Sequence, residues 1–393
     1  MPHAPLIEIS GPPRLRGEAH GEAARDRIRL GLDHYGAQIA RHGLDRAGLA
    51  ALSEGFLPRI AAFDADYVQE MEGMAAGAGV PLSDIVLLNA RTEILQLAER
   101  QAAAEGLLPE DDPDGCTGLV VLPEACADGR LIHAMNWDWK AECAETAVVL
   151  RITGTEDPDI LTFAEAGQLA RCGLNAAGIA ITANYLECDR DYRSLGVPLA
   201  LLRRKVLQCR HLAPALKAAY CTPKSAANNI LISQAGGFGI DLECAPDETF
   251  QVQPHDGLIV HANHWQSPVA LSKLRDTGVA STPDSLYRDV RVRQHLAPQR
   301  GRITAETVKA ALFDDYQTPH SVCRPPRPGS SGNLSATVAM IVMTPAEGRM
   351  EVAMLPALDR SFATHNLAPT ACAPGAAPAT DNSNDHRNRR ERA

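Results

Sequence analysis

The sequence has no long hydrophobic run and no excess of positive charge, and each absence excludes a class of protein. None of its apolar runs reaches the roughly 18 residues that a membrane-spanning helix needs, so we expect no such segment. The first residues, Met1 to Pro5, lack the basic and apolar regions of a secretory signal, so a cytoplasmic location is expected. A formal net charge of −10 disfavours nucleic acid and anionic membranes as partners.

Paired cysteines and metal-binding motifs are also missing. The ten cysteines stand singly between Cys116 and Cys372, and without a CxxC motif they are expected to be reduced thiols. His261 and His264 are three residues apart, but they follow a strand-like run and no third ligand is evident. The glycines of 236–239 are not a phosphate-binding loop, because neither Lys-Ser/Thr nor a helix follows them. We therefore predict no metal and no cofactor.

The most informative stretch is the one where a polar turn meets a buried strand. Residues 111–115 read Asp-Asp-Pro-Asp-Gly, and Cys116 is followed by an apolar, β-branched run up to Leu122. Cys116 therefore lies at a loop-to-strand junction, where its thiol could attack the carbonyl of Gly115. Cleavage there would leave thiol and amine on one residue. The alternative interpretation is a small core cysteine that begins a strand.

A second strand, from Leu131 to Trp139, follows after a turn that contains Asp128 and Gly129. If the two strands form a hairpin, position 116 lies opposite position 138 to within about two residues. The carboxylate of Asp138 would then lie beside the amine that cleavage creates. Such an amine can act as the base for its own side chain, since its pKa of about 7.7 is close to the thiol value of about 8.5.

These two segments carry a resemblance to a known family. Asp-Gly-Cys-Thr at 114–117, followed by Asn-Trp-Asp-Trp at 136–139, resembles the peptidase C45 family, the N-terminal-nucleophile (Ntn) hydrolases that include the isopenicillin N acyltransferases. The resemblance spans roughly residues 15 to 360. Further matching fragments follow in the family's order: Asn89 to Glu93, Glu165 to Gly167, Gly173 to Asn175, His261 to His264 and Ser321 to Arg324.

The resemblance implies a role for several residues. Cys116 would be the nucleophile, Asp138 would hold its amine, Asn263 would stabilise an oxyanion, and Arg324 would lie near the nucleophile. Thr117 and Glu165 would support the site. Three of these residues also have a purely structural interpretation: Asp138 as a hairpin carboxylate, Asn263 as a turn residue and Arg324 as part of a buried salt bridge. Pro325 and Pro326 depart from the family's usual continuation.

The order of elements predicts an α+β protein. Residues 1–115 are expected to be mainly helical, with helices over Gly17 to Ile39, Phe56 to Ala76 and, capped by Ser83, Asp84 to Leu97. From 116 to 365, strands, then helices, then strands indicate antiparallel sheets covered by helices. The resemblance implies a four-layer α-β-β-α sandwich. The polar tail, 366–393, is expected to be disordered.

Two interpretations of function remain from the sequence. The first is a self-processing acyltransferase or amidohydrolase that forms an S-acyl intermediate on Cys116. Its partners would be a small N-acyl amide or an acyl-coenzyme A thioester as substrate, water or an amine as acceptor, and the two fragments of the same chain. The second is a non-enzymatic Ntn-fold binding protein that is never cleaved. Arg91 and Glu93 are a solvated ion pair in one interpretation and functional groups in the other.

Overall fold

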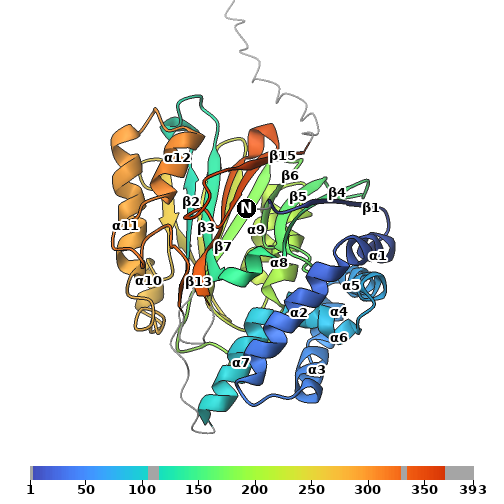
Figure 1. The fold of residues 1–393 in the computed structure, drawn as a ribbon. Helices are drawn as coiled ribbons and strands as arrows, with labels where there is room; N and C mark the ends of the chain where they lie inside the picture. Colours follow the sequence, from blue (N-terminus) through green and yellow to red (C-terminus); the bar gives the residue numbers. More distant parts are fainter. Residues whose placement is uncertain (1–2, 105–114, 329–333, 368–393) are drawn as a thin grey trace, which may run out of the picture.

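Two β-sheets lie face to face at the centre of the molecule (Figure 1). The computed structural model describes residues 3–104, 115–328 and 334–367. The larger sheet has eight strands, in the spatial order β1 (Leu6–Ser10), β4 (Ala147–Thr153), β5 (Ile160–Glu165), β6 (Cys172–Asn175), β7 (Ile179–Tyr185), β8 (Asn228–Gln234), β9 (Phe238–Cys244) and β10 (Thr249–Val252). The smaller has seven, in the order β11 (Leu258–His261), β2 (Cys116–Val121), β3 (Ile132–Lys140), β13 (Leu334–Thr344), β14 (Arg349–Met354) and β15 (Ala363–Asn366), with β12 (Arg327–Pro328) beside β13.

Helices cover both outer faces. The seven-stranded sheet packs its outer face on α11 (Ser285–Leu296) and α12 (Ala305–Leu312), through residues such as Leu119, Val292 and Val308. The helices on the other side are α1 (Pro13–Ala23), α2 (Arg25–Ala40), α3 (Arg46–Glu54), α4 (Leu57–Phe63), α5 (Ala65–Ala78), α6 (Leu82–Asn89), α7 (Arg91–Ala104), α8 (Leu199–Leu207) and α9 (Leu212–Cys221). The short α10 (Pro268–Leu271) follows β11. The predicted α+β class and the four-layer order are thus confirmed.

The inner strands are buried along nearly their whole length because both of their faces are covered. Every residue of β2 and β5 is buried, and ten of the eleven in β13 are. Across the inter-sheet space the Trp137 and Phe163 rings meet edge to face, with centroids 5.8 Å apart. The strands that carry the site are therefore held on both sides by close packing.

The N-terminal segment differs from its prediction in five places. The helices expected over 17–39 and 84–97 are each divided into two, at Ala24 and at Ala90. The segment is not only helical, because Leu6–Ser10 forms β1, which pairs in parallel with β4. The helix expected over 56–76 breaks at Asp64, whose extended backbone and side-chain bond to the Asp66 amide begin α5. Ser83 is not an N-cap, since Pro81 precedes α6 and Ser83 lies within it.

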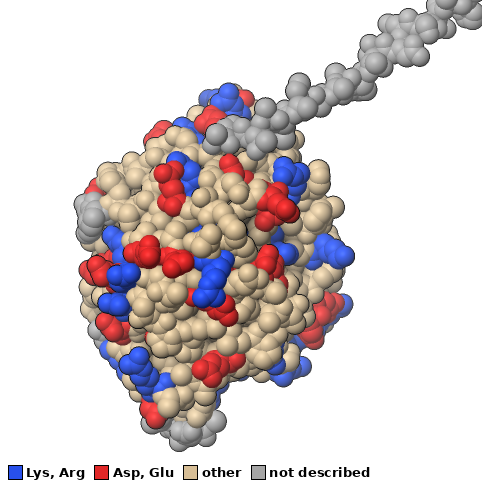
Figure 2. Space-filling model, turned by 90° about the vertical axis from the view of Figure 1, so that its right-hand side faces the viewer, with Lys and Arg blue, Asp and Glu red and all other residues tan. Residues whose placement is uncertain are grey.

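Charges of both signs are interspersed on the face shown in Figure 2. Exposed pairs such as Arg14 and Glu72 (3.0 Å) are screened by water and stabilise the fold little. Among the described residues, no single helix is long and apolar enough to span a membrane; α5 and α6, bent by 117°, pass that test only jointly. Of the tail predicted at 366–393, Asn366 belongs to β15, and residues 368–393 lie outside the described residues. Residues 105–114, just before Gly115, also lie outside them.

Candidate active site

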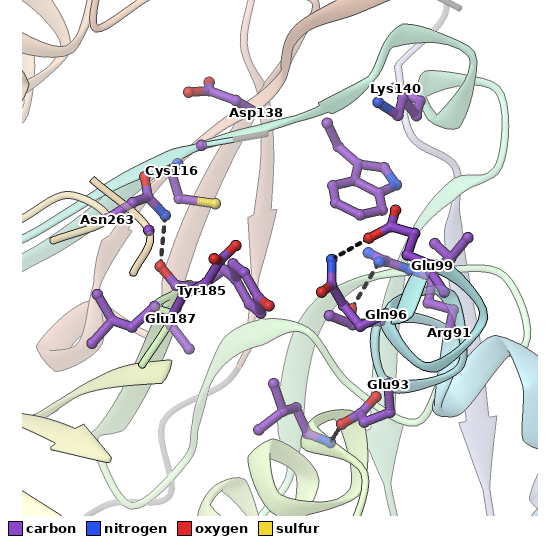
Figure 3. A pocket seen from close by; sticks show the side chains of 18 of the residues that line it. Arg91, Glu93, Gln96, Glu99, Cys116, Asp138, Lys140, Tyr185, Glu187 and Asn263 are labelled. Atoms are coloured by element: carbon purple, nitrogen blue, oxygen red, sulfur yellow. Dashed lines mark hydrogen bonds between the residues drawn. The ribbon is translucent and has the colours of Figure 1, made fainter. Parts of the chain in front are cut away.

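Cys116 is the first residue of β2 and faces the space between the sheets. Its partner across the β2–β3 ladder is Trp137, one residue from the predicted register. The side chain is 5% exposed and lines a cavity of about 300 Å³. Figure 3 shows the sulfur directed into this cavity, with Asn263 on the same wall and with α7 residues opposite: Arg91, Glu93, Gln96 and Glu99. The loop-to-strand cysteine is therefore the one that reaches the cavity.

The peptide bond between Gly115 and Cys116 is held at both ends. The Gly115 carbonyl accepts a hydrogen bond from the Asp138 amide (2.9 Å), and the Cys116 amide donates to Asn263 Oδ1 (2.8 Å). The Cys116 carbonyl accepts a third bond from Arg288 Nη1 (2.6 Å). The carbonyl carbon that a self-attack would target is thus fixed relative to the sulfur.

Asn263 follows β11, and its orientation is determined by its neighbours. Two donors point at its Oδ1, the Cys116 amide and Arg288 Nη2 (both 2.8 Å), so this atom has to be the oxygen. Its Nδ2 donates to the Tyr185 carbonyl (2.8 Å; dashed in Figure 3). No further acceptor for Nδ2 is found among the described residues, and Asn263 lines the cavity.

The Asp138 carboxylate lies on the other face of the ladder from the Cys116 sulfur. Because Trp137 is the residue opposite Cys116, Asp138 is one position further and points away (Figure 3). It accepts from Thr337 Oγ1 (2.6 Å) and lies 3.4 Å from Arg324 Nε, and burial raises the pKa of its carboxyl. In the uncut chain it is Asn263, and not Asp138, that bonds the Cys116 nitrogen.

Arg324 is fully buried beside the Gly115–Cys116 peptide bond. Its Nη2 pairs with Asp284, and Arg288 Nε bonds the same carboxylate at 2.7 Å. A Cβ added to Gly115 would lie 3.0 Å from the Nη2 atoms of both arginines. This close approach explains why glycine precedes the cysteine. Arg288 and Asp284 were not identified as site residues from the sequence; their i, i+4 spacing, which suits an ion pair on a helix, was the available signal.

Arg171 is the charged group nearest the sulfur. Its Nη2 is 4.0 Å from Cys116 Sγ, and its guanidinium stacks on Trp137, 4.0 Å from the ring centre. Burial raises the pKa of the Cys116 thiol, and the Arg171 charge opposes this rise. No motif or spacing in the sequence pointed to Arg171, which lies just before β6.

The two supporting residues lie in different networks. Thr117 Oγ1 accepts from Arg288 Nη1 at 2.9 Å, directly behind the cysteine. Glu165 accepts from Tyr35 (2.6 Å) and from Arg91 Nε (2.6 Å), at the far side of the cavity.

Arg91 and Glu93 are not the solvated ion pair that one interpretation offered. Both are 3% exposed, and Glu93 accepts from the Leu199 amide at 2.9 Å. Although Arg91 and Glu93 are close in sequence, each bonds a different partner: Arg91 bonds Glu165, and Glu93 bonds the Leu199 amide.

Metal ligands are not gathered anywhere in the described ranges, where no group of three His, Cys, Asp or Glu could hold an ion. His261 is hydrogen-bonded to Glu243 (2.8 Å) and His264 to Ser285 (2.8 Å). Both histidines thus have protein partners.

Comparison with known proteins shows the family to which the chain belongs. The model of the family described as acyl-coenzyme A:6-aminopenicillanic acid acyl-transferase matches residues 126–354, more than half of the 393. The chain belongs to this acyltransferase family. The predicted family and the predicted enzyme class are thereby confirmed. Asp138, Asn263 and Arg324 lie within the matched range, whereas Gly115 and Cys116 precede it.

The acyltransferase family also supplies a relative of similar length. The acyl-coenzyme A:6-aminopenicillanic-acid-acyltransferase 40 kDa form of Emericella nidulans is 28% identical over 334 residues, which are 83% of this chain and 86% of the relative. Among solved structures, a mutant of conjugated bile acid hydrolase from Clostridium perfringens is 12% identical (TM-score 0.45; 64% of this chain, 92% of that one). Penicillin V acylase from Agrobacterium tumefaciens is 14% identical (TM-score 0.39; 63% and 84%).

Proposed function

We propose that the chain cuts itself between Gly115 and Cys116 and then transfers or hydrolyses acyl groups through an S-acyl intermediate on Cys116. The observation that carries this proposal is the geometry of that peptide bond, whose carbonyl and amide are each held by a specific partner while the sulfur faces a cavity. Family membership supports acyl-transfer chemistry, and the position of the nucleophile is inferred from the site.

Self-cleavage would use the groups already in place. The Cys116 sulfur attacks the Gly115 carbonyl carbon, and the oxyanion keeps its bond to the Asp138 amide. The C–N bond breaks, the thiol proton passes to the Cys116 nitrogen, and a thioester remains. Water then hydrolyses this thioester, giving a Gly115 carboxylate and a free amine and thiol on Cys116. The new amine keeps Asn263 Oδ1 as its hydrogen-bond acceptor.

Turnover would repeat the same attack on a substrate. The free amine takes the thiol proton, which matters because burial raises the pKa of this thiol. Arg171, 4.0 Å away, favours the thiolate, and the unused Nδ2 hydrogen of Asn263 is placed to stabilise the substrate oxyanion. An amine or water then takes the acyl group from sulfur. An acyl-coenzyme A thioester, named for the relative, is one candidate donor alongside small N-acyl amides.

The two fragments would stay together after cleavage. β1 pairs along five residues with β4 of the eight-stranded sheet, and core residues from α2 to α7 pack in the same cluster as that sheet. Arg91 and Glu93 of α7 also bond residues beyond the cut, Glu165 and Leu199. Helices of the first fragment thus complete both the core and the cavity.

The test is a denaturing gel followed by acid trapping. Wild type should show fragments of 115 and 278 residues, and Cys116→Ala a single band. A quenched mixture of processed protein and substrate should carry an acyl group on Cys116. A single full-length band from active wild type would contradict self-processing. Full activity after selective alkylation of Cys116 would contradict the covalent intermediate.

A further inference from the structure

Two arginines at the cavity have no carboxylate partner in the part of the chain that the structure describes. Arg171 is 8% exposed, with its Nε buried and unbonded, and the only hydrogen-bond acceptor of its guanidinium in the described ranges is the Cys116 sulfur at 4.0 Å. Arg203, on α8, lines the same cavity; its Nε is also buried and unbonded, and none of the ion pairs or hydrogen bonds among the described residues uses its guanidinium. Both guanidinium groups therefore line the cavity without an ion-pair partner among the described residues.

The neighbouring arginines show that this arrangement is specific to the cavity. Arg91 pairs with Glu165 at 2.6 Å. Arg204, adjacent to Arg203 on the same helix, lies 3.3 Å from Glu70. A buried guanidinium without a counter-charge is costly, so proteins pair such groups or use them to bind a ligand. On α8, Arg204 is therefore paired with a carboxylate, whereas Arg203, which lines the cavity, has no ion pair among the described residues.

The charges around Arg203 leave a net positive field. Burial lowers the pKa of Arg203 to about 9, and repulsion from Arg171 and Arg91 adds to this. Glu93 opposes the shift, but no ion pair joins them among the described residues, and its Oε1 accepts from the Leu199 amide. Glu99 and Glu187 also line the cavity, but the carboxylate that raises the pKa of Arg203 is Glu93. Because Arg91 is paired with Glu165, Glu93 offsets at most one of the two remaining guanidinium groups. An anion that enters the cavity would supply the missing charge.

We propose that the cavity binds an acyl compound that carries a carboxylate close to its scissile carbonyl, and that Arg171 and Arg203 bind this carboxylate. The inference rests on the proposed function, because the scissile carbonyl is the one that Cys116 attacks. Guanidinium groups suit this ligand, since their paired N–H donors match the two carboxylate oxygens.

The position of Arg171 limits where the anion can lie. Because its Nη2 is 4.0 Å from the sulfur, the carboxylate has to be only a few bonds from the carbonyl under attack. The phosphates of a coenzyme A thioester are at the far end of a long arm and do not meet this condition. Two sources do: the carboxylate of an amino acid in an N-acyl amino acid, and the second carboxylate of a diacid acyl group.

Matched substrate pairs test the inference and separate the two sources. N-Butyrylglycine and N-butyrylglycinamide differ only in a carboxylate on the amine side, and N-methylsuccinamic acid and N-methylsuccinamide only in one on the acyl side. In one of the pairs, processed wild type should favour the carboxylate in kcat/KM by about 10- to 100-fold. This preference should collapse to about 1 in Arg203→Gln.

Arg41→Gln is the matched control, since Arg41 is exposed at the edge of the same cavity. It should leave the preference unchanged. Equal turnover of both members in both pairs, or a preference that survives Arg203→Gln, would overturn the inference.

Calorimetric binding of the same four compounds to Cys116→Ala separates the two proposals, because the cavity is present in the uncut chain. Carboxylate-selective binding that is lost on adding Arg203→Gln supports the inference, even if processed wild type turns over none of the compounds and the proposed function fails. Equal binding of acid and amide overturns the inference and leaves the proposed function standing.

Discussion

Asn263 accepts a hydrogen bond from the Cys116 nitrogen at 2.8 Å through Oδ1, while its Nδ2 donates to the Tyr185 carbonyl. One side chain thus holds the Cys116 nitrogen through its oxygen and the Tyr185 carbonyl through its nitrogen. Arg288, which bonds both the Cys116 carbonyl and Asn263 Oδ1, fixes this orientation. Substitutions at Asn263 can distinguish the role of its oxygen from that of its nitrogen.

The first prediction separates these two ends. Asn263→Asp keeps an oxygen for the Cys116 nitrogen and for Arg288 but has no donor for an oxyanion. Turnover by the processed variant should fall by roughly 10²–10³-fold, while fragments still form. Asn263→Ala removes both ends and should impair processing as well. Wild-type kcat in processed Asn263→Asp would remove this residue from the oxyanion site.

The second prediction concerns Gly115. In Gly115→Ala, the new Cβ would lie 3.0 Å from nitrogens of Arg288 and Arg324 and would displace the carbonyl from the sulfur. Appearance of the two fragments should slow on the order of 10- to 100-fold in a time course. Gly36→Ala is the control, because a Cβ there meets no atom within 4 Å and alanine favours a helix. Equal processing rates for Gly115→Ala and wild type would show that the close approach is not needed.

The third prediction concerns Asp138, whose contacts point to a positioning role. Asp138→Asn removes one of the two carboxylates beside Arg324, so that Asp284 remains, and it weakens the bond to Thr337. We expect slower processing and turnover, together with a loss of about 1–3 kcal/mol in unfolding free energy by chemical denaturation. The exposed Asp128→Asn serves as control. Slower turnover at an unchanged unfolding free energy would instead favour a direct role at the amine.

The fourth prediction is a pH dependence of stability that arises between the sheets. His133 of β3 bonds Thr182 of β7 and Ser233 of β8 (both 2.8 Å), and burial lowers its pKa to about 3. The unfolded chain binds a proton near pH 6.5 and the folded chain does not, so this contribution is present above about pH 6.5 and is lost as pH falls toward 3. Between about pH 6 and 4, His133→Gln should flatten the decline in unfolding free energy by about 1.4 kcal/mol per pH unit. An unchanged slope would contradict a neutral buried imidazole.

Local sequence indicated the loop-to-strand junction at Cys116 and the class of fold. Turn residues end at Gly115 and a β-branched run begins beyond Cys116, so the junction follows from neighbours in the chain. The same local logic predicted most helices and strands from 116 onward. It missed β1, because a five-residue edge strand is stabilised by pairing with β4, about 140 residues away.

Only the tertiary structure decided which groups meet at Cys116. A one-residue difference in register turned the Asp138 carboxylate to the opposite face and left Asn263 at the nitrogen, since successive side chains alternate across a strand. Arg171, Arg203 and Arg288 converge on the cavity or the cut from three separate elements. Periodicity in a sequence shows which face of a helix or strand is buried. It does not show which side chains of distant elements pack against that face. The sequence therefore pointed to Cys116 as the candidate nucleophile, and the fold set the charged surroundings of that residue.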